Sequence, residues 1–185
     1  MTEPWNNLSR RRFIQLSALG SGGVLLLSQC SKPNLLWRFF TNTEAQLMDA
    51  IADQLIPPDE WLGGRESGVT NFINKQLVGP YVRFQERYRK GLKPVQDSCE
   101  AMYFMKFEKL SHEEQISFLE KMEVGLLCKT LWTEVSDREL FSLIRDHSMQ
   151  AYYGSFRHGE NKNNESYKML QLDYPLIIGQ NRYKT

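Results

Sequence analysis

A chain of 185 residues has room for one domain, or for one domain and a tail. Its composition, 41% hydrophobic and 24% charged, is ordinary for a soluble globular protein. The formal net charge is +1 and becomes −1 once residues 1–30, with three arginines and one glutamate, are set aside. A near-neutral chain lacks the clustered positive charge that displaces counterions from phosphates, which argues against a general nucleic-acid binder.

The N-terminus reads as an export signal. Three consecutive arginines precede Phe13 and Ile14, and a modest apolar stretch follows from residue 16 to residue 27. Arg10, Arg11 and Phe13 stand where a twin-arginine signal places its determinants. The alternative is a short membrane anchor, but a span needs roughly 20 apolar residues and glycine and serine interrupt this one. We therefore expect residues 1–30 to be a twin-arginine signal peptide that exports a folded protein to the periplasm.

Cys30 is a candidate lipidation site. Leu27 and Cys30 have the spacing of a lipobox, and residues 31–40 suit a tether, although Gln29 stands where a small residue is usual. An acylated Cys30 would hold the protein on a membrane surface. The alternative is an incidental cysteine in a discarded peptide.

The remainder, residues 41–185, reads as helical. Thr41 and Glu44 form a capping box, apolar residues recur along one face, and Pro57-Pro58 ends that helix. A loop over 59–66 and a helix over 67–77 follow. Residues 81–106 have helical period, with a break or kink expected at Gly91 and Pro94. This segment is rich in basic residues: Arg83, Arg87, Arg89, Lys90 and Lys93. They suggest either a nucleic-acid patch or the solvated face of a helix, and we favour the solvated face because acidic residues are interleaved with them.

Two further helices are expected after the capping boxes that begin at Ser111 and Ser136. Strand signals are scarce, so the predicted class is all-α, with about five or six helices. From about residue 154 the chain turns polar and then, over 167–175, aromatic and apolar, without helical period. We expect an irregular tail that either covers its own core or lies against a partner.

No cofactor or catalytic motif is present. The sequence has no Gly-rich dinucleotide fingerprint, P-loop, haem-attachment motif or cysteine run for an iron–sulfur cluster. His112, His147 and His158 are widely separated, which does not suit a zinc site, and His147 suits helix packing. Cys99 and Cys128 are a candidate disulfide that would stabilise the fold by roughly 2–4 kcal/mol. The alternative is two separate thiols.

The chain resembles the gluconate 2-dehydrogenase subunit 3 family, also called the gamma chain. The likeness begins with the twin-arginine leader. It continues through Phe39, Phe40, Thr41, Glu44, Met48, Ile51, Ala52, Leu55, Ile56, Pro57, Asp59, Gly63, Glu66, Gly68, Val69, Phe72 and Ile73. It closes on Tyr152, Tyr153, Gly154, Gly159, Asn161, Tyr167, Leu170, Tyr174 and Pro175. The chain departs from the family pattern at Leu62, Ser155, Phe156, Glu160 and Tyr167.

The resemblance implies a non-catalytic small subunit. Family members accompany a large FAD-dependent dehydrogenase of the glucose-methanol-choline type, which oxidises a sugar, sugar acid or glycoside, and a cytochrome c often accepts the electrons. The small subunit carries the signal for the twin-arginine translocase and supports maturation of its partner, which alone binds FAD.

Aromatic side chains anchor protein interfaces well, so the tail supplies the candidate interface: Tyr152, Tyr153, Gly154, Asn161, Tyr167 and Tyr174. The same groups would also serve as core residues. The alternative function is a free-standing helical envelope lipoprotein that binds a ligand or a partner protein.

Overall fold

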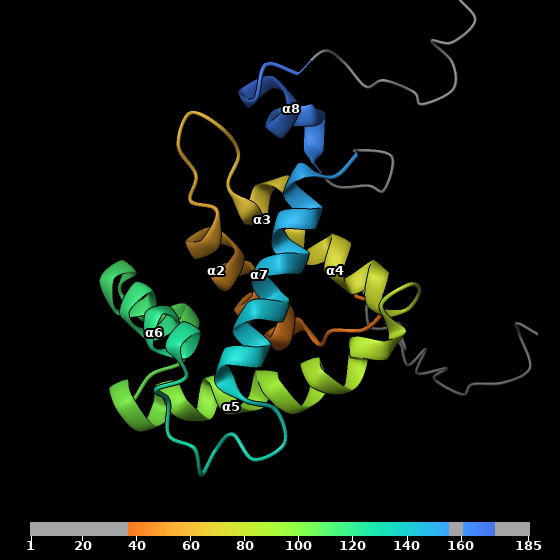
Figure 1. Ribbon diagram of the computed structural model, residues 1–185. Coiled ribbons are helices and arrows are strands. Elements are labelled where there is room, and N and C mark those ends of the chain that lie inside the picture. Colours follow the sequence, from red (N-terminus) through yellow and green to blue (C-terminus); the bar gives the residue numbers. More distant parts are fainter. Residues whose placement is uncertain (1–36, 156–160, 173–185) are drawn as a thin grey trace, which may run out of the picture. The chain divides into compact units, whose positions relative to one another are not determined.

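Helices and their connecting turns make up all of the chain that the computed structural model describes, residues 37–155 and 161–172 (Figure 1). These residues hold seven α-helices and no strand, which confirms the predicted all-α class. In chain order they are α2 (Asn42–Leu55), α3 (Gly64–Ser67), α4 (Val69–Leu77), α5 (Gln85–Tyr103), α6 (His112–Val124), α7 (Asp137–Tyr153) and α8 (Glu165–Met169). Short 3-10 turns are η1 (Val82–Phe84), η2 (Phe107–Lys109) and η4 (Lys162–Asn164). The predicted signal residues Arg10, Arg11 and Phe13, together with Cys30 and Tyr174, lie outside the described residues.

Two of the three predicted capping boxes form completely. At α2, the Thr41 hydroxyl accepts from the Glu44 amide at 3.2 Å, and the Glu44 carboxylate accepts from the Thr41 amide at 2.7 Å. Ser111 and Glu114 make the same reciprocal pair at α6. At α7 only half of the box forms, because the Glu139 carboxylate pairs with Arg87 at 2.9 Å instead. The hydroxyl alone therefore caps α7.

Of the break or kink predicted at Gly91 and Pro94, the break is wrong, because α5 runs unbroken from Gln85 to Tyr103. Gly91 serves packing: a Cβ built there would lie 2.7 Å from both methyl carbons of Leu140, so any other residue would force the Leu140 side chain to move. Pro94 costs α5 one backbone hydrogen bond, yet Leu92 and Val95 on either side are buried and hold the turn in place. The helix predicted over 67–77 corresponds to α4. The predicted loop over 59–66 is wrong at its end, because residues 64–66 belong to α3, which Gly68, at φ +95°, separates from α4.

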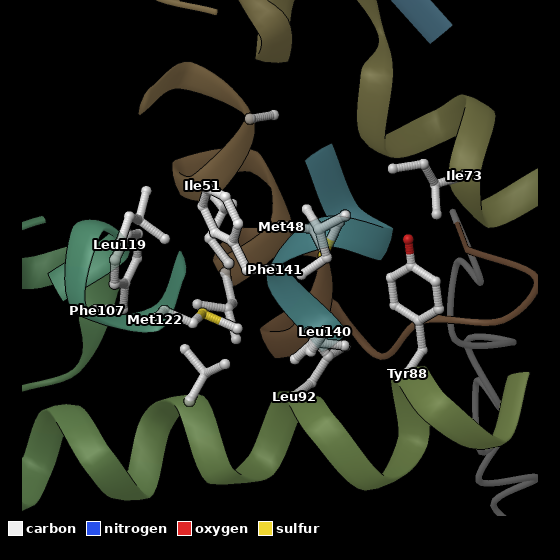
Figure 2. Packing of buried hydrophobic residues seen from close by; sticks show 14 of the residues in the cluster. Met48, Ile51, Ile73, Tyr88, Leu92, Phe107, Leu119, Met122, Leu140 and Phe141 are labelled. Atoms are coloured by element: carbon white, nitrogen blue, oxygen red, sulfur yellow. The ribbon is translucent and has the colours of Figure 1, made fainter. Parts of the chain in front are cut away.

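Helix α7 lies at the centre and contacts every other α-helix of the described chain. In Figure 1 it runs through the middle of the bundle, and α5 crosses its N-terminal half. Figure 2 shows the side chains that meet there: Met48 and Ile51 of α2, Ile73 of α4, Tyr88 and Leu92 of α5, Leu119 and Met122 of α6, and Leu140 and Phe141 of α7. The described helices therefore share one apolar core.

The segment before α2 belongs to this core. Phe39 and Phe40 are buried, and the Asn74 side-chain oxygen accepts from the amides of residues 38, 39 and 40 at 2.8–3.3 Å. The Arg89 guanidinium lies 4.0 Å from the Phe39 ring centroid and bonds both carboxylate oxygens of Glu44. The packed domain thus includes the last residues of the predicted tether.

Replacing Gly64 should destabilise the fold. A Cβ at Gly64 would lie 2.7 Å from the carbonyl carbon of Ala52 and closer still to its oxygen, so α2 and α3 would have to separate. We expect Gly64→Ala to lower the free energy of unfolding by about 1–3 kcal/mol. Gly79→Ala is the matched control, since the nearest atom to its Cβ is 3.7 Å away. Urea denaturation of both variants measures this, and equal stabilities would contradict the steric argument.

Candidate partner interface

The C-terminal end of α7 places the two predicted tyrosines in opposite environments. Tyr152 is only 3% exposed and belongs to the core, whereas Tyr153 is 44% exposed. Their rings meet edge to face, with centroids 5.1 Å apart. Tyr152 therefore takes the structural role that the sequence left open, and Tyr153 is free to contact another molecule.

Asn161 holds the tail against the end of α7. Its side-chain amide donates to the Gly154 carbonyl at 2.9 Å, and its oxygen accepts from the Ser166 amide at 3.1 Å. The residue is buried and has φ +56°, a left-handed conformation that asparagine tolerates. Gly154 is also constrained, because a Cβ there would lie 2.5 Å from the Gln150 carbonyl oxygen. Asn161 and Gly154 thus position the tail rather than present a contact surface.

The tail is more regular than predicted, because residues 165–169 form α8. Its Tyr167 is half-buried, while Leu170 and Leu172, which follow the helix, are 48% and 54% exposed. Among the described tail residues, the aromatic and large aliphatic side chains available to a partner are therefore Tyr167, Leu170 and Leu172, with Tyr153 from α7.

A second apolar surface, which sequence reasoning missed, lies at the C-terminal end of α5. Phe104 is 90% exposed, and Met102 and Met105 beside it are 39% and 44% exposed; we call these three residues the α5 tip. Phe104 also has φ +57°, a left-handed conformation that costs a residue with a side chain roughly 1–2 kcal/mol. A glycine would relieve both the strain and the exposure. The signal in the sequence was an apolar run over 101–105 longer than one buried helix face requires.

The basic residues of α5 are mostly neutralised by carboxylates. Arg87 pairs with Glu139, Arg89 with Glu44, Lys93 with Asp97, and Lys90 with both Glu86 and Glu134, at N–O distances of 2.5–2.9 Å. This arrangement fits the solvated helix face inferred from the interleaved acids. Such exposed pairs contribute little to stability, typically below about 1 kcal/mol each.

His147 lies inside an aromatic cluster. Its ring stacks on Tyr81 with centroids 4.3 Å apart, meets Phe84 edge on at 5.1 Å, and bonds the Tyr88 hydroxyl through Nδ1 at 3.0 Å. Burial lowers the pKa of His147 to about 4, an effect that nearby Asp146 opposes and Arg83 reinforces. Burial likewise raises the pKa of Tyr88 well above its ordinary value. Both groups are therefore neutral at pH 7, and His147 has the packing role that the sequence predicted.

The two cysteines are free in the structure, so the expected Cys99–Cys128 bridge is not formed there. Cys99 is fully buried in α5, and this burial raises the pKa of its thiol to about 12. Cys128 is exposed, and hydrogen bonds with Thr130 lower the pKa of its thiol.

Two properties of the described residues concern metal sites and membrane spans. Within them, no group of three or more histidine, cysteine, aspartate or glutamate side chains could hold a metal ion. Over the same residues, every helix is too short or too polar to cross a bilayer. This part of the chain has a packed helical core and exposed apolar side chains, among them those of the α5 tip and those around Tyr153.

Comparison with protein families identifies the family of this chain. The family described as Gluconate 2-dehydrogenase subunit 3 matches residues 42–173, a span that includes every α-helix of the described chain. Comparison with curated proteins and with solved structures gives no match.

The buried His147 should make stability depend on pH. The unfolded chain, with an ordinary histidine pKa of 6.5, binds more protons than the folded chain between about pH 4 and 6.5. We expect the contribution of His147 to be complete above pH 6.5 and to fall by about 3 kcal/mol as the pH drops to 4, at about 1.4 kcal/mol per pKa unit. Denaturant unfolding across this range measures it. His147→Gln, which keeps an acceptor for Tyr88, should show a shallower slope; an unchanged slope would assign the effect elsewhere.

Proposed function

Because the chain belongs to the gluconate 2-dehydrogenase subunit 3 family, we propose that it is the non-catalytic small subunit of a periplasmic FAD-dependent dehydrogenase. In this proposal it supports the export and maturation of a large catalytic subunit of the glucose-methanol-choline type, which oxidises a sugar, sugar acid or glycoside. A cytochrome c would then accept the electrons. The observation that carries the proposal is the family match across the whole described helical domain.

The proposal assigns FAD to the catalytic subunit because the residues of this chain do not fit it. Dinucleotides are commonly held at a Gly-rich turn between a strand and a helix. The sequence has no such glycine pattern, and the described residues contain no strand from which that turn could begin. The helical domain thus acts through contacts with its partner.

Two features support an accessory role. The N-terminal sequence matches a pathway that exports folded proteins, so one signal on this chain would serve a complex assembled in the cytoplasm. The exposed apolar groups at the α5 tip and around Tyr153 would be buried by the partner. Burying one large apolar side chain contributes about 1.5–3 kcal/mol, so a few such anchors would hold the complex together during export.

Co-purification tests the proposal directly. The chain, tagged at its C-terminus and expressed in its native host, should bring down one larger chain in fixed proportion from the periplasmic and membrane fractions. The eluate should show the visible absorption of flavin. A correctly processed protein that purifies alone and colourless would overturn the proposal and favour the free-standing lipoprotein.

Phe104→Gly should stabilise the isolated chain and weaken the complex. Glycine removes the cost of the left-handed backbone, so we expect the free energy of unfolding to rise by up to about 1 kcal/mol. The loss of the exposed ring should weaken partner binding at least about tenfold, which corresponds to 1.4 kcal/mol. Urea denaturation and quantitative pull-down measure the two effects. Leu126→Ala, which removes a side chain that is 73% exposed at another place, is the control and should leave binding unchanged. Equal binding by both variants would exclude the α5 tip.

Replacing Arg10 and Arg11 together by lysine should block export. The double variant keeps the positive charge but loses the arginine pair, so we expect the chain and its catalytic partner to remain in the cytoplasm. Cell fractionation with flavin absorption as the second readout measures this. Arg12→Lys is the control and should be exported normally; periplasmic accumulation of the double variant would rule out the twin-arginine route.

A further inference from the structure

A cleft of about 360 Å³ lies beside the His147 cluster, between η1 with the start of α5 and one face of α7. The rings of Tyr81, Phe84 and His147 line it, together with the polar side chains of Arg83, Arg87 and Gln150. His147 is only 3% exposed, so its ring forms part of the floor, while Arg83 and Gln150 are exposed at the rim.

The acceptors of this cleft already have cationic partners. The Glu139 carboxylate pairs with Arg87 at 2.9 Å, and the Asp146 carboxylate pairs with Arg145 at 3.0 Å. Neither acid is therefore a strong site for a further cation. The charge left over is that of Arg83, whose guanidinium lies 4.7 Å from the Phe84 ring centroid and has no carboxylate within ion-pair distance among the described residues.

Two donors of the cleft, the Gln150 side-chain amide and one ring nitrogen of His147, have no acceptor among the described residues. The Gln150 side-chain oxygen accepts from the Tyr81 hydroxyl, which leaves the Gln150 amide N–H groups directed elsewhere. Tyr88 is fully buried, and its hydroxyl has the Nδ1 atom of His147 as its partner among the described residues. If Nδ1 carried the proton, the Tyr88 hydroxyl would accept it and its own proton would stay buried without an acceptor, at a cost of about 1–3 kcal/mol. Tyr88 therefore donates to Nδ1, and Nε2 of His147 carries the ring proton.

We propose that this cleft binds a carboxylate group, held by the guanidinium of Arg83, the Nε2–H of His147 and the side-chain amide of Gln150. Each of these groups lines the cleft, each donates, and the acids around them are already paired. The aromatic walls exclude water on one side and so strengthen these bonds. The carboxylate comes either from a small organic acid or from an acidic side chain of the catalytic subunit. The inference goes beyond the accessory role; a small organic acid is independent of that role, whereas a carboxylate from the catalytic subunit rests on it.

The first test uses the purified chain alone. Sodium acetate is titrated at constant ionic strength and pH 7, and the ring resonances of His147 are followed by NMR, identified by their absence from His147→Gln. We expect a saturable shift with acetate and none with acetamide, which has the same shape without the charge. Arg83→Gln should weaken acetate binding at least tenfold. Arg138→Gln, which removes an exposed arginine of α7 outside the cleft, is the matched control and should bind as the unaltered chain does.

The second test distinguishes the two sources of carboxylate. If acetate has no effect, the same resonances are recorded in the presence of the chain that co-purifies. A shift that is lost in Arg83→Gln but kept in Arg138→Gln would assign the site to an acidic side chain of the partner. The inference is overturned if neither acetate nor a co-purifying chain moves the His147 resonances. It is also overturned if the Arg83 and Arg138 variants behave alike. Because the acetate experiment needs no partner, its outcome is independent of the co-purification that tests the accessory role.

Discussion

The fold depends on how closely α5 and α7 approach each other at Gly91 and Leu140. Helix α7 contacts every other α-helix of the described chain, so its position sets theirs. The absence of a side chain at residue 91 leaves room for Leu140 of α7, and Tyr88, one turn earlier on α5, lies beside His147 of α7. The same packing therefore builds the core and the aromatic floor of the cleft.

Local features of the fold could be predicted from the sequence, and features that depend on packing could not. The hydroxyl and carboxylate of a capping box lie three residues apart. The starts of the helices after Thr41 and Ser111 could therefore be predicted from the local sequence alone. Pro94 gives an equally local signal to break a helix, yet buried neighbours outweigh it. Packing also decides that Cys99 is buried and Cys128 exposed, which residue spacing alone does not reveal.

For the candidate interface, the sequence indicated a region of the chain but not which of its side chains are exposed. The aromatic motif near the C-terminus indicated the end of α7. On that helix, however, Tyr152 faces the core and Tyr153 faces outward. The Asn161 side chain is not available to a partner, because its hydrogen bonds to Gly154 and Ser166 hold α8 in place. The apolar run over 101–105 was visible in the sequence, but the left-handed backbone of Phe104 could not be foreseen, because phenylalanine rarely takes this conformation at the end of a helix. The resemblance to the family supplied the function, which the composition and periodicity of the chain do not contain.

Phe104 and His147 are the residues that folding alone explains least, and they differ in kind. Phe104 has an exposed ring and a strained backbone. Burial of the ring in a larger assembly would offset the cost of that strain. His147 is a neutral base enclosed by aromatic rings, where an apolar side chain would pack without the loss of hydration. Natural sequences depart from local consistency mainly where function requires it. In a subunit without a catalytic motif, these two departures direct attention to contact with a partner and to recognition of a charged group.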